Sequence, residues 1–338
     1  MAHRWSPLLA RRDLLRGGLA GLTAAALTGW RPSRSQAGGR GSISLPPAPL
    51  RRGAHLRAVN PGTWMDPETD FTPLQQRCAA EGWTLEVPDR VKGQWRYFSA
   101  RDHDRVADLE QAWSDPSVDA VITLGGGWGG ARVLEAGFRF PRRAKWMLGF
   151  SDTSSLLLAQ WAAGLPGAIH GSSGGEAHQW QRTVDLLSGR PVAPLVGSAL
   201  RTKTSSSSQQ ASGPLVVTNL TVATHLIGTP WFPDLRGAVL VLEDVGEAPY
   251  RIDRMLTQWR SCGLLQELAA IGCGRFSWAE DDILPGDFSM EEVLEERLGD
   301  LGIPVLLNLP VGHGRPNMAL PLGRQAELDP KRASLTVL

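Results

Sequence analysis

The sequence predicts an α/β fold built on a mostly parallel sheet. Short apolar runs alternate along the chain with segments whose apolar residues recur at helical spacing, as in strand–helix–strand units. The 338 residues correspond to about two domains and are enough to bury cores without a disulfide or metal. A hydrophobic content of 42% is ordinary for a globular protein and excludes disorder of the whole chain.

In the first half, the predicted strand at residues 55–59 ends at the turn Asn60-Pro61-Gly62. A helix follows with Phe71, Leu74 and Cys78 on one face, so Cys78 is expected in the core. The next elements are a strand at 84–87, a helix at 101–113, a strand at 119–124, a glycine-rich loop at 125–130 with a helix after it, a strand at 145–150, and a helix through Leu156, Leu157 and Trp161.

Residues 191–213 contain four consecutive serines, lack apolar periodicity and are expected to form an exposed linker. This linker would separate a first domain at 55–190 from a second at 214–338, with another linker at 38–54. The second domain is expected to contain strands at 215–217, 238–242 and 305–309, another strand after 268–271, helices at 252–265 and 290–298, and a terminal hairpin at 326–338.

Residues 1–37 have the pattern of an export signal. The pair Arg11-Arg12 precedes Leu14-Leu15, an uncharged stretch runs from 17 to 29, and small residues at 35–37 suit a cleavage site. The paired arginines predict the twin-arginine route, and hence a periplasmic or otherwise exported protein. A transmembrane anchor is disfavoured because the apolar run is shorter than the roughly 20 residues a span needs.

The charge of the chain is nearly balanced, with 35 Lys and Arg against 34 Asp and Glu. Removing residues 1–37 would leave a net charge of −4. This balance argues against nucleic acid as a partner. Three cysteines, none in a CxxC pair, argue against a cysteine-based zinc site, although Cys262 and Cys273 could pair after export. Thirteen tryptophans accompany only two tyrosines, and the sequence alone assigns no role to this excess.

The first candidate for chemistry is Ser151, which lies between an apolar strand and a helix. A sharp strand-to-helix turn exposes such a side chain and directs helix-start N–H groups toward the same point, where they suit an oxyanion. The alternative is that Ser151 or Asp152 only caps the helix. An α/β-hydrolase elbow is disfavoured, because it needs glycine two residues after the serine, where this chain has Thr153.

The glycine-rich loop at 125–130 follows a buried strand, so its backbone could approach an anion. A nucleotide phosphate is one reading of this loop. It is weak, because no Lys-Ser/Thr pair follows the glycines and no acidic residue lies about 20 positions further on. An oxyanion or peptide-backbone cradle fits the same loop equally well.

Two further strand ends supply an acid and a histidine. Glu243 and Asp244 end an apolar strand, where an unpaired carboxylate is costly to desolvate. His313 lies between two glycines after another strand, and His170 has a similar setting. A serine hydroxyl needs a base to take its proton, and the base needs a carboxylate to orient it. Serine, acid and histidine thus occur in chain order, each at a strand end.

These residues carry a resemblance to the LD-carboxypeptidase, or muramoyltetrapeptide carboxypeptidase, family. It extends in order over nearly the whole chain after the signal. The most specific piece is the run from Leu242 to Leu256, Leu-Glu-Asp-Val-Gly-Glu…Tyr-Arg-Ile-Asp-Arg. The other matching pieces are Gly126-Gly127-Trp128-Gly129 with Arg132, Gly149-Phe150-Ser151-Asp152, Ile169-His170-Gly171, Asn219-Leu220-Thr221, Gly228-Thr229-Pro230 and Gly312-His313-Gly314.

The resemblance implies a serine peptidase with Ser151 as nucleophile, His313 as general base and acid, and Glu243 as the carboxylate that orients His313. The backbone N–H groups of Asp152 and Gly127 would form the oxyanion hole. It also implies a flavodoxin-like or amidotransferase-like N-terminal domain, a swivelling β/α C-terminal domain, a homodimer, and no metal or cofactor.

The substrate implied is a muropeptide tetrapeptide that loses its terminal D-alanine by cleavage of an L-to-D bond. A sister branch, the microcin-immunity peptidases, cleaves a peptidyl-nucleotide instead, and a non-catalytic muropeptide-binding protein is a third reading. The carboxylate of the terminal D-alanine needs a cationic or N–H-rich pocket, for which charge alone nominates Arg132, Arg251 and Arg254.

Overall fold

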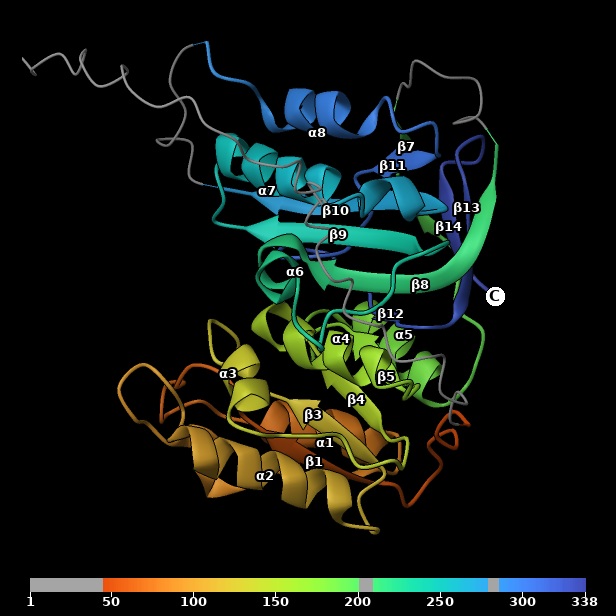
Figure 1. The fold of residues 1–338 in the computed structure, drawn as a ribbon. Coiled ribbons are helices and arrows are strands. Elements are labelled where there is room, and N and C mark those ends of the chain that lie inside the picture. The colour runs from red at the N-terminus through yellow and green to blue at the C-terminus, as the bar shows by residue number, and fades with distance from the viewer. Residues whose placement is uncertain (1–44, 201–208, 279–285) are drawn as a thin grey trace, which may run out of the picture. The chain divides into compact units, whose positions relative to one another are not determined.

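A computed structural model describes residues 45–200, 209–278 and 286–338, which belong to one compact unit (Figure 1). The predicted export signal at 1–37 lies outside the described residues, as do residues 38–44 of the linker at 38–54. Among the helices of the described ranges, none combines the length and apolar character needed to cross a bilayer.

The first half forms a six-stranded sheet in the order β12-β5-β4-β3-β1-β2, parallel except for β12. Its strands are β1 (His55–Val59), β2 (Thr84–Glu86), β3 (Ala120–Thr123), β4 (Trp146–Gly149), β5 (Ala168–His170) and β12 (Leu320–Pro321). Its helices are α1 (Thr72–Ala80), α2 (Asp102–Ser114), α3 (Gly130–Glu135), α4 (Ser154–Ala162), α5 (Ala177–Leu187) and the 3₁₀ turns Asp89–Lys92 and Ser151–Thr153.

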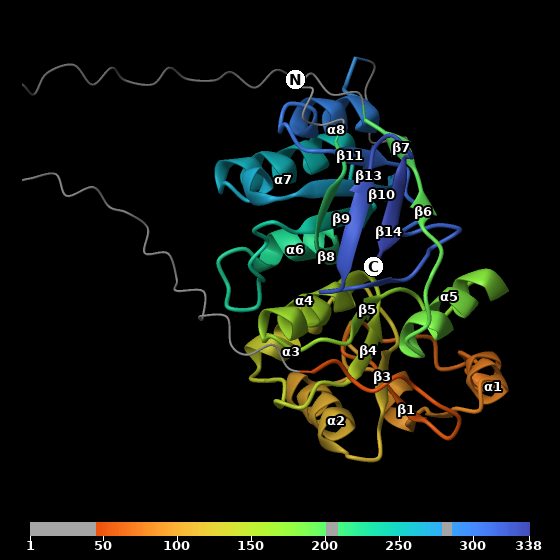
Figure 2. The same ribbon diagram turned by 90° about the vertical axis from the view of Figure 1, so that its right-hand side faces the viewer.

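The second half forms an eight-stranded sheet in the order β6-β14-β13-β8-β9-β10-β11-β7, in which β8 to β11 are parallel. Figure 2 shows the terminal hairpin of β13 and β14 beside β8. The elements are β6 (Leu195–Val196), β7 (Ser198–Ala199), β8 (Ala211–Asn219), α6 (Leu220–Leu226), β9 (Val239–Val245), α7 (Pro249–Ser261), the 3₁₀ turn Leu265–Glu267, β10 (Ala270–Ser277), α8 (Met290–Leu298), β11 (Val305–Leu307), β13 (Gln325–Asp329) and β14 (Ser334–Val337).

The two faces of the first sheet belong to two different cores. Along β3, Val121 packs into a core shared with the second sheet, whereas Ala120 and Ile122 pack into a core on the opposite face. Successive strand residues point to opposite faces, and both faces are covered here, so Ala120, Val121 and Ile122 are all apolar. The α/β class and the parallel first sheet therefore agree with the sequence prediction.

The main difference from the sequence expectation lies at 191–213, expected to be an exposed linker. This range contains the short edge strands β6 and β7 and the first residues of β8, and only 201–208 lie outside the described residues. In addition, β12 comes from the second half of the chain but pairs with β5 in the first sheet. Strands of two residues leave too little pattern in a sequence to be recognised.

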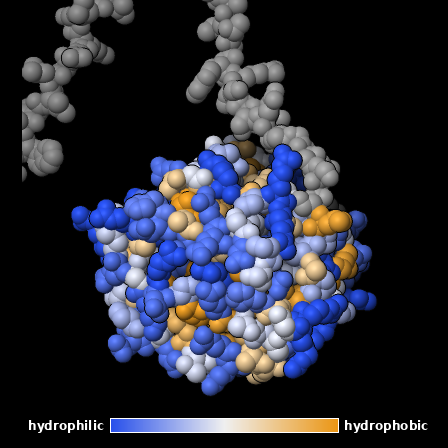
Figure 3. Space-filling model, turned by 90° about the horizontal axis from the view of Figure 1, so that it is seen from below, coloured by the Kyte–Doolittle hydropathy of each residue, from blue (hydrophilic) through white to orange (hydrophobic). Residues whose placement is uncertain are grey.

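The lower face of the molecule shows no sign of a large apolar surface. In Figure 3 it is a mosaic of hydrophilic residues with small separate hydrophobic areas, as is ordinary for protein surfaces. The features that bear on chemistry lie elsewhere, where the carboxyl ends of β3 and β4 approach those of β8, β9 and β11. Helix α4, which starts just after Ser151, contacts α6 and β8 there.

Candidate active site

Ser151, His313 and Glu243 form one line of hydrogen-bonding groups. Nε2 of His313 lies 3.0 Å from Oγ of Ser151, and Nδ1 lies 2.8 Å from Oε2 of Glu243. The backbone N–H of His313 donates to the same carboxylate oxygen at 3.1 Å. The Glu243 side chain is fully buried and that of His313 is 23% exposed. With the proton on Nδ1, Nε2 can accept the proton of the serine hydroxyl.

Ser151 lies on a sharp turn from β4 into α4. Its φ of 61° lies in the left-handed region, which is uncommon for residues other than glycine. The hydroxyl of Thr153 accepts from the N–H of Phe150 at 2.7 Å and braces the turn. Neither the 3₁₀ turn nor α4 has a side-chain cap, so the reading of Ser151 as a simple helix cap does not describe its contacts.

The glycine-rich loop lies against Ser151. A Cβ atom built on Gly126 would lie 3.5 Å from Cβ and 3.6 Å from Oγ of the serine. Gly127, the residue predicted for the oxyanion hole, lies one position further along, and a Cβ atom built on it would collide with the side chain of Thr63. Asp152, the other predicted residue, directly follows the serine and ties the two loops together, since its Oδ2 accepts from the N–H of Gly130 at 2.7 Å.

The Asp152 carboxyl is 1% exposed. Burial raises its pKa from 3.8 to about 6, against the opposing effect of hydrogen bonds from Gly130 and Gly129 and of the charge of Arg105. The hydrogen bond from Gly130, the first residue of α3, nevertheless connects the carboxyl to the start of that helix.

Asp152→Asn is expected to gain stability relative to the wild type as the pH rises from about 4 to about 6. The unfolded chain loses the Asp152 proton near pH 3.8, whereas the folded chain keeps it to about 6, so the wild type loses free energy of unfolding across this window. The amide has no such proton, and the difference amounts to about 3 kcal/mol. Chemical denaturation of both proteins across this pH range measures it. A difference that does not change with pH would contradict the prediction.

The adjacent acids Glu243 and Asp244 have separate partners. Whereas Glu243 contacts His313, Oδ2 of Asp244 accepts from the N–H and the hydroxyl of Thr221 at 2.8 and 2.9 Å, at the start of α6. Burial raises the pKa of Asp244 to about 6. The geometry thus separates two acids that the sequence left as alternatives, and Glu247, a third, pairs with Arg251.

Asn219 belongs to the quoted piece Asn219-Leu220-Thr221, but the sequence reading gave it no role in the site. Its Nδ2 donates to Oε1 of Glu243 at 3.3 Å and to Oδ1 of Asp244 at 3.2 Å. Its Oδ1 accepts from the N–H of Val222 at 3.0 Å, so it also caps α6. The available signal was its position, a buried polar residue at the end of strand β8 beside the end of β9.

Gly312→Ala is expected to displace Glu243 and lower activity strongly. Gly312 has a φ of 107°, and a Cβ atom there would lie 2.7 Å from Cβ and 2.8 Å from Oε2 of Glu243. The variant combines backbone strain with a steric clash. Activity and thermal unfolding, measured together, check the prediction, with the open position Gly286→Ala as a control. Unchanged activity of Gly312→Ala would contradict it.

His170, the second histidine in a similar setting, does not contact Ser151. It is fully buried, neither ring nitrogen has a partner among the described residues, and burial lowers its pKa to about 4. The ring of Phe150 contacts both histidines, with centroid distances of 5.2 Å to His170 and 4.5 Å to His313. The structure thus brings His313, and not His170, to the serine.

A buried guanidinium supports the glycine-rich loop from beneath. Arg105 is 2% exposed and donates to the carbonyl oxygens of Pro61 and Gly129 and to the carboxylate of Asp102. Desolvation lowers the pKa of Arg105, and the hydrogen bond to the charged Asp102 partly offsets this shift. Arg132, a sequence candidate for binding the substrate carboxylate, pairs with the same Asp102.

The other two arginine candidates, Arg251 and Arg254, lie on α7 and contact neighbouring side chains of this protein. Arg251 lies 3.4 Å from Glu247, and the guanidinium of Arg254 lies 5.9 Å from the centroid of the Tyr250 ring. Arg275, which sequence reasoning missed, is exposed near the end of β10 and donates to the carbonyl oxygen of Arg315 at 3.1 Å, on the loop that carries His313.

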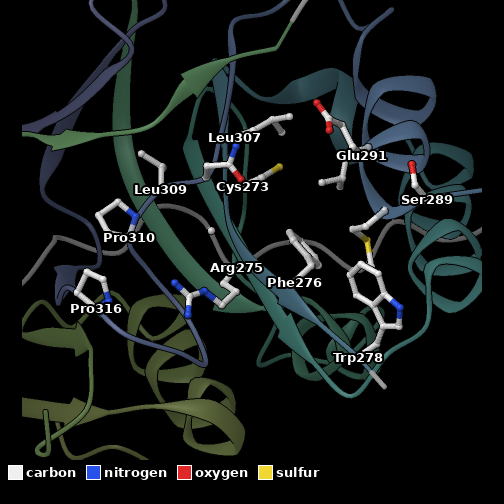
Figure 4. A pocket seen from close by; sticks show the side chains of 14 residues that line it. Cys273, Arg275, Phe276, Trp278, Ser289, Glu291, Leu307, Leu309, Pro310 and Pro316 are labelled. Atoms are coloured by element: carbon white, nitrogen blue, oxygen red, sulfur yellow. The ribbon is translucent and has the colours of Figure 1, made fainter. Parts of the chain in front are cut away.

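Beside Arg275 a pocket of about 550 Å³ opens between β10, β11 and α8 (Figure 4). Its lining ranges from Arg275 and Pro316 near the His313 loop to Ser289 and Glu291 at α8. None of the three residues Ser151, Glu243 and His313 lines it.

No group of three or more His, Cys, Asp or Glu side chains in the described ranges is placed to hold a metal ion. The three cysteines are free, with Cys78 and Cys273 buried and Cys262 exposed. The sequence-based possibility of a Cys262–Cys273 disulfide is therefore not realised in this structure.

Sequence comparison finds matches to the two domains of one protein family. Residues 57–171 match the LD-carboxypeptidase N-terminal domain and residues 212–328 match the C-terminal domain. A putative carboxypeptidase of Synechocystis is 39% identical over 87% of this chain and 97% of its own length. The murein tetrapeptide carboxypeptidase of Pseudomonas aeruginosa is 32% identical over 76% of this chain and 87% of its own length.

Solved structures show the same fold. The muramoyltetrapeptide carboxypeptidase from Oxalobacter formigenes, 25% identical, superimposes with a TM-score of 0.65 over 83% of this chain and 97% of its own. The microcin C7 self immunity protein MccF, 19% identical, superimposes with a TM-score of 0.72 over 87% of this chain and 98% of its own. The two domain matches and the extended identity to curated relatives show that the chain belongs to the LD-carboxypeptidase family of serine peptidases.

Proposed function

We propose that this protein is an exported carboxypeptidase that releases the terminal D-alanine from muropeptide tetrapeptides. The main support is the chain of hydrogen-bonding contacts from Ser151 through His313 to the buried Glu243. It occurs in a chain 32% identical to a murein tetrapeptide carboxypeptidase, and the substrate class is proposed from that relative.

In the proposed mechanism, Nε2 of His313 takes the proton of the Ser151 hydroxyl as Oγ attacks the carbonyl carbon before D-alanine. Glu243 keeps the imidazole oriented and stabilises its charge. The backbone N–H groups of Asp152 and Gly127 are proposed to receive the developing oxyanion, in line with the position of their loops beside the serine. His313 then gives its proton to the leaving amine, and a water activated by His313 hydrolyses the acyl-enzyme.

Export would bring the enzyme to the cell-wall compartment, where muropeptides arise by cleavage of peptidoglycan. The basis for this part is the twin-arginine pattern at 11–16 followed by an uncharged stretch. The proposed role is remodelling of the wall or recovery of its peptides. The family resemblance further supports a homodimer, which sedimentation of the purified protein would test.

The test of the function is release of free D-alanine from a purified tetrapeptide, quantified by mass spectrometry. The tripeptide product and D-alanine should appear in equal amounts. An intact tetrapeptide after prolonged incubation with folded enzyme would reject the proposal. Fusion of residues 1–37 to a reporter that functions only after folded export tests localisation, with Arg11→Lys/Arg12→Lys as the matched control.

A second candidate function is cleavage of a peptidyl-nucleotide, as in the microcin-immunity branch. The fold likeness to MccF favours it, whereas the export pattern argues against it. Incubation of one enzyme sample with both substrate types distinguishes the two. Faster turnover of the peptidyl-nucleotide would favour this second function over the first.

A further inference from the structure

The proposed nucleophile and its base come from different sheets. Ser151 follows β4 of the first sheet, whereas His313 follows β11 of the second, 162 residues further along the chain. The 3.0 Å between Nε2 of His313 and Oγ of Ser151 therefore depends on how the loop that carries the histidine is fixed to the first half of the chain. We call residues 312–317 the histidine loop.

The histidine loop is closed by the side chain of Asn317. Its Oδ1 accepts from the backbone N–H of Gly312 at 3.0 Å, so the first and last residues of the loop are joined in a buried contact. Just outside the loop, the N–H of Met318 donates to the carbonyl oxygen of Pro310 at 2.8 Å. These two contacts fix the base from which the His313 side chain extends.

Helix α5 attaches the closed histidine loop to the first half. Oε1 of Gln179 accepts from the backbone N–H of Asn317 at 3.0 Å, in a buried contact that joins residues 138 positions apart. Arg182 lies three residues further along the same side of the helix and donates to the carbonyl oxygens of Ala319 and Ala193 at 2.8 and 2.6 Å. The backbone is thus anchored to α5 on both sides of residue 318, just before β12 joins the first sheet.

The amide of Gln179 is an expensive group to place in the interior. The residue is 4% exposed, and Nε2 has no hydrogen-bond partner among the described residues. A buried donor left unpaired costs more free energy than an apolar side chain of similar size in the same place. The backbone also makes room for this amide, since a Cβ atom on Gly175 would lie 2.7 Å from Oε1. Such a side chain is expected where it serves a purpose other than stability.

We propose that Gln179 and Asn317 are positioning residues, which act through the histidine loop to hold the general base at hydrogen-bond distance from the nucleophile. Glu243 also contacts His313, but it lies on β9, in the same sheet as β11, so it orients the ring without fixing it to the first sheet. Gln179 and Asn317 supply a link to the sheet that carries Ser151. This inference rests on the roles given to the three residues in the proposed function.

The experiment measures kcat and KM for D-alanine release by Gln179→Met and Asn317→Ala. The first change removes the acceptor for the N–H of Asn317, and the second removes the acceptor for the N–H of Gly312. Each is expected to lower kcat about 10- to 100-fold and to leave KM within about threefold, because a displacement of about 1 Å is enough to slow the chemical step. The double variant should lose less than the product of the two single losses, since both changes loosen the same loop.

Gln179→Glu and Asn317→Asp are the rescue variants. Each keeps an acceptor oxygen in the same place, whether or not the buried carboxyl takes up a proton, and should retain at least about a third of kcat. Thr183→Val is the matched control, because Thr183 is 1% exposed on the same helix and its hydroxyl donates to the carbonyl oxygen of Gln179 within that helix. It should keep kcat unchanged. Thermal unfolding establishes which variants are folded, and the two loop contacts are tested independently of each other.

Wild-type kcat in a folded Gln179→Met or Asn317→Ala protein would overturn the proposal, as would equal losses of kcat in the rescue variants and in Thr183→Val. If the wild type released no D-alanine, the proposed function would fail instead. Crystal structures of the wild type and Gln179→Met would then decide the positioning. A distance from Nε2 of His313 to Oγ of Ser151 that is longer by about 1 Å in the variant supports it, and an unchanged distance rejects it.

Discussion

Ser151→Ala is expected to reduce release of D-alanine by about 10⁴- to 10⁶-fold. Oγ of Ser151 lies 3.0 Å from Nε2 of His313. Alanine has no group that could attack the carbonyl carbon of the substrate. Binding should survive, because the change removes a single oxygen atom and leaves the glycine-rich loop in place. Turnover is measured by D-alanine release and binding of the tetrapeptide by calorimetry.

The control is Ser114→Ala, at an exposed serine that ends α2, which should keep full activity. Circular dichroism and thermal unfolding of both variants establish that each is folded. Turnover of a folded Ser151→Ala protein at the wild-type rate would eliminate Ser151 as the nucleophile.

The strands and the approximate site were predictable from local sequence. Predicted strands such as 55–59 and 145–150 coincide with β1 and β4 to within one residue at each end. The residues of β4 are all buried and without charge, and the buried residues of β1 are apolar, so each strand leaves a pattern in the sequence. The candidate residues were found because each follows or ends such a strand, and the carboxyl ends of parallel strands lie at one edge of a sheet.

The selection among neighbouring acids was not predictable in the same way. Glu243 and Asp244 are adjacent on β9 and so point to opposite faces of the strand. Local sequence does not reveal which face meets His313 and which meets the start of α6. Their partners are 70 and 23 residues distant in the chain, so only the tertiary fold decides.

The burial of Arg105 was hidden for a related reason. A charged residue in a polar helix is usually exposed, and the helical pattern placed Val106, Leu109 and Trp113 on the buried side. Arg105 is buried because carbonyl oxygens from two distant loops, at Pro61 and Gly129, satisfy its guanidinium. Such partners lie 44 and 24 residues away and leave no mark on the local pattern.

Glu243→Gln is expected to lower kcat by about 10³- to 10⁴-fold, with little change in KM. Oε2 of Glu243 accepts from both Nδ1 and the backbone N–H of His313. The neutral amide no longer stabilises the positive charge that the imidazole gains when Nε2 takes the serine proton. The loss therefore arises in the chemical step and not in binding.

The matched comparison is Asp244→Asn, one residue along the same strand. Its carboxylate binds Thr221 at the start of α6 and does not contact His313, so this variant should keep kcat within about tenfold. Kinetics and denaturation of the two variants together test the assignment. If Asp244→Asn lost the greater part of kcat while Glu243→Gln retained it, Asp244 would be the carboxylate that orients His313. The structure predicts the opposite. Among the described contacts, the Glu243 carboxylate lies within hydrogen-bond distance of the His313 ring, whereas that of Asp244 binds Asn219 and Thr221.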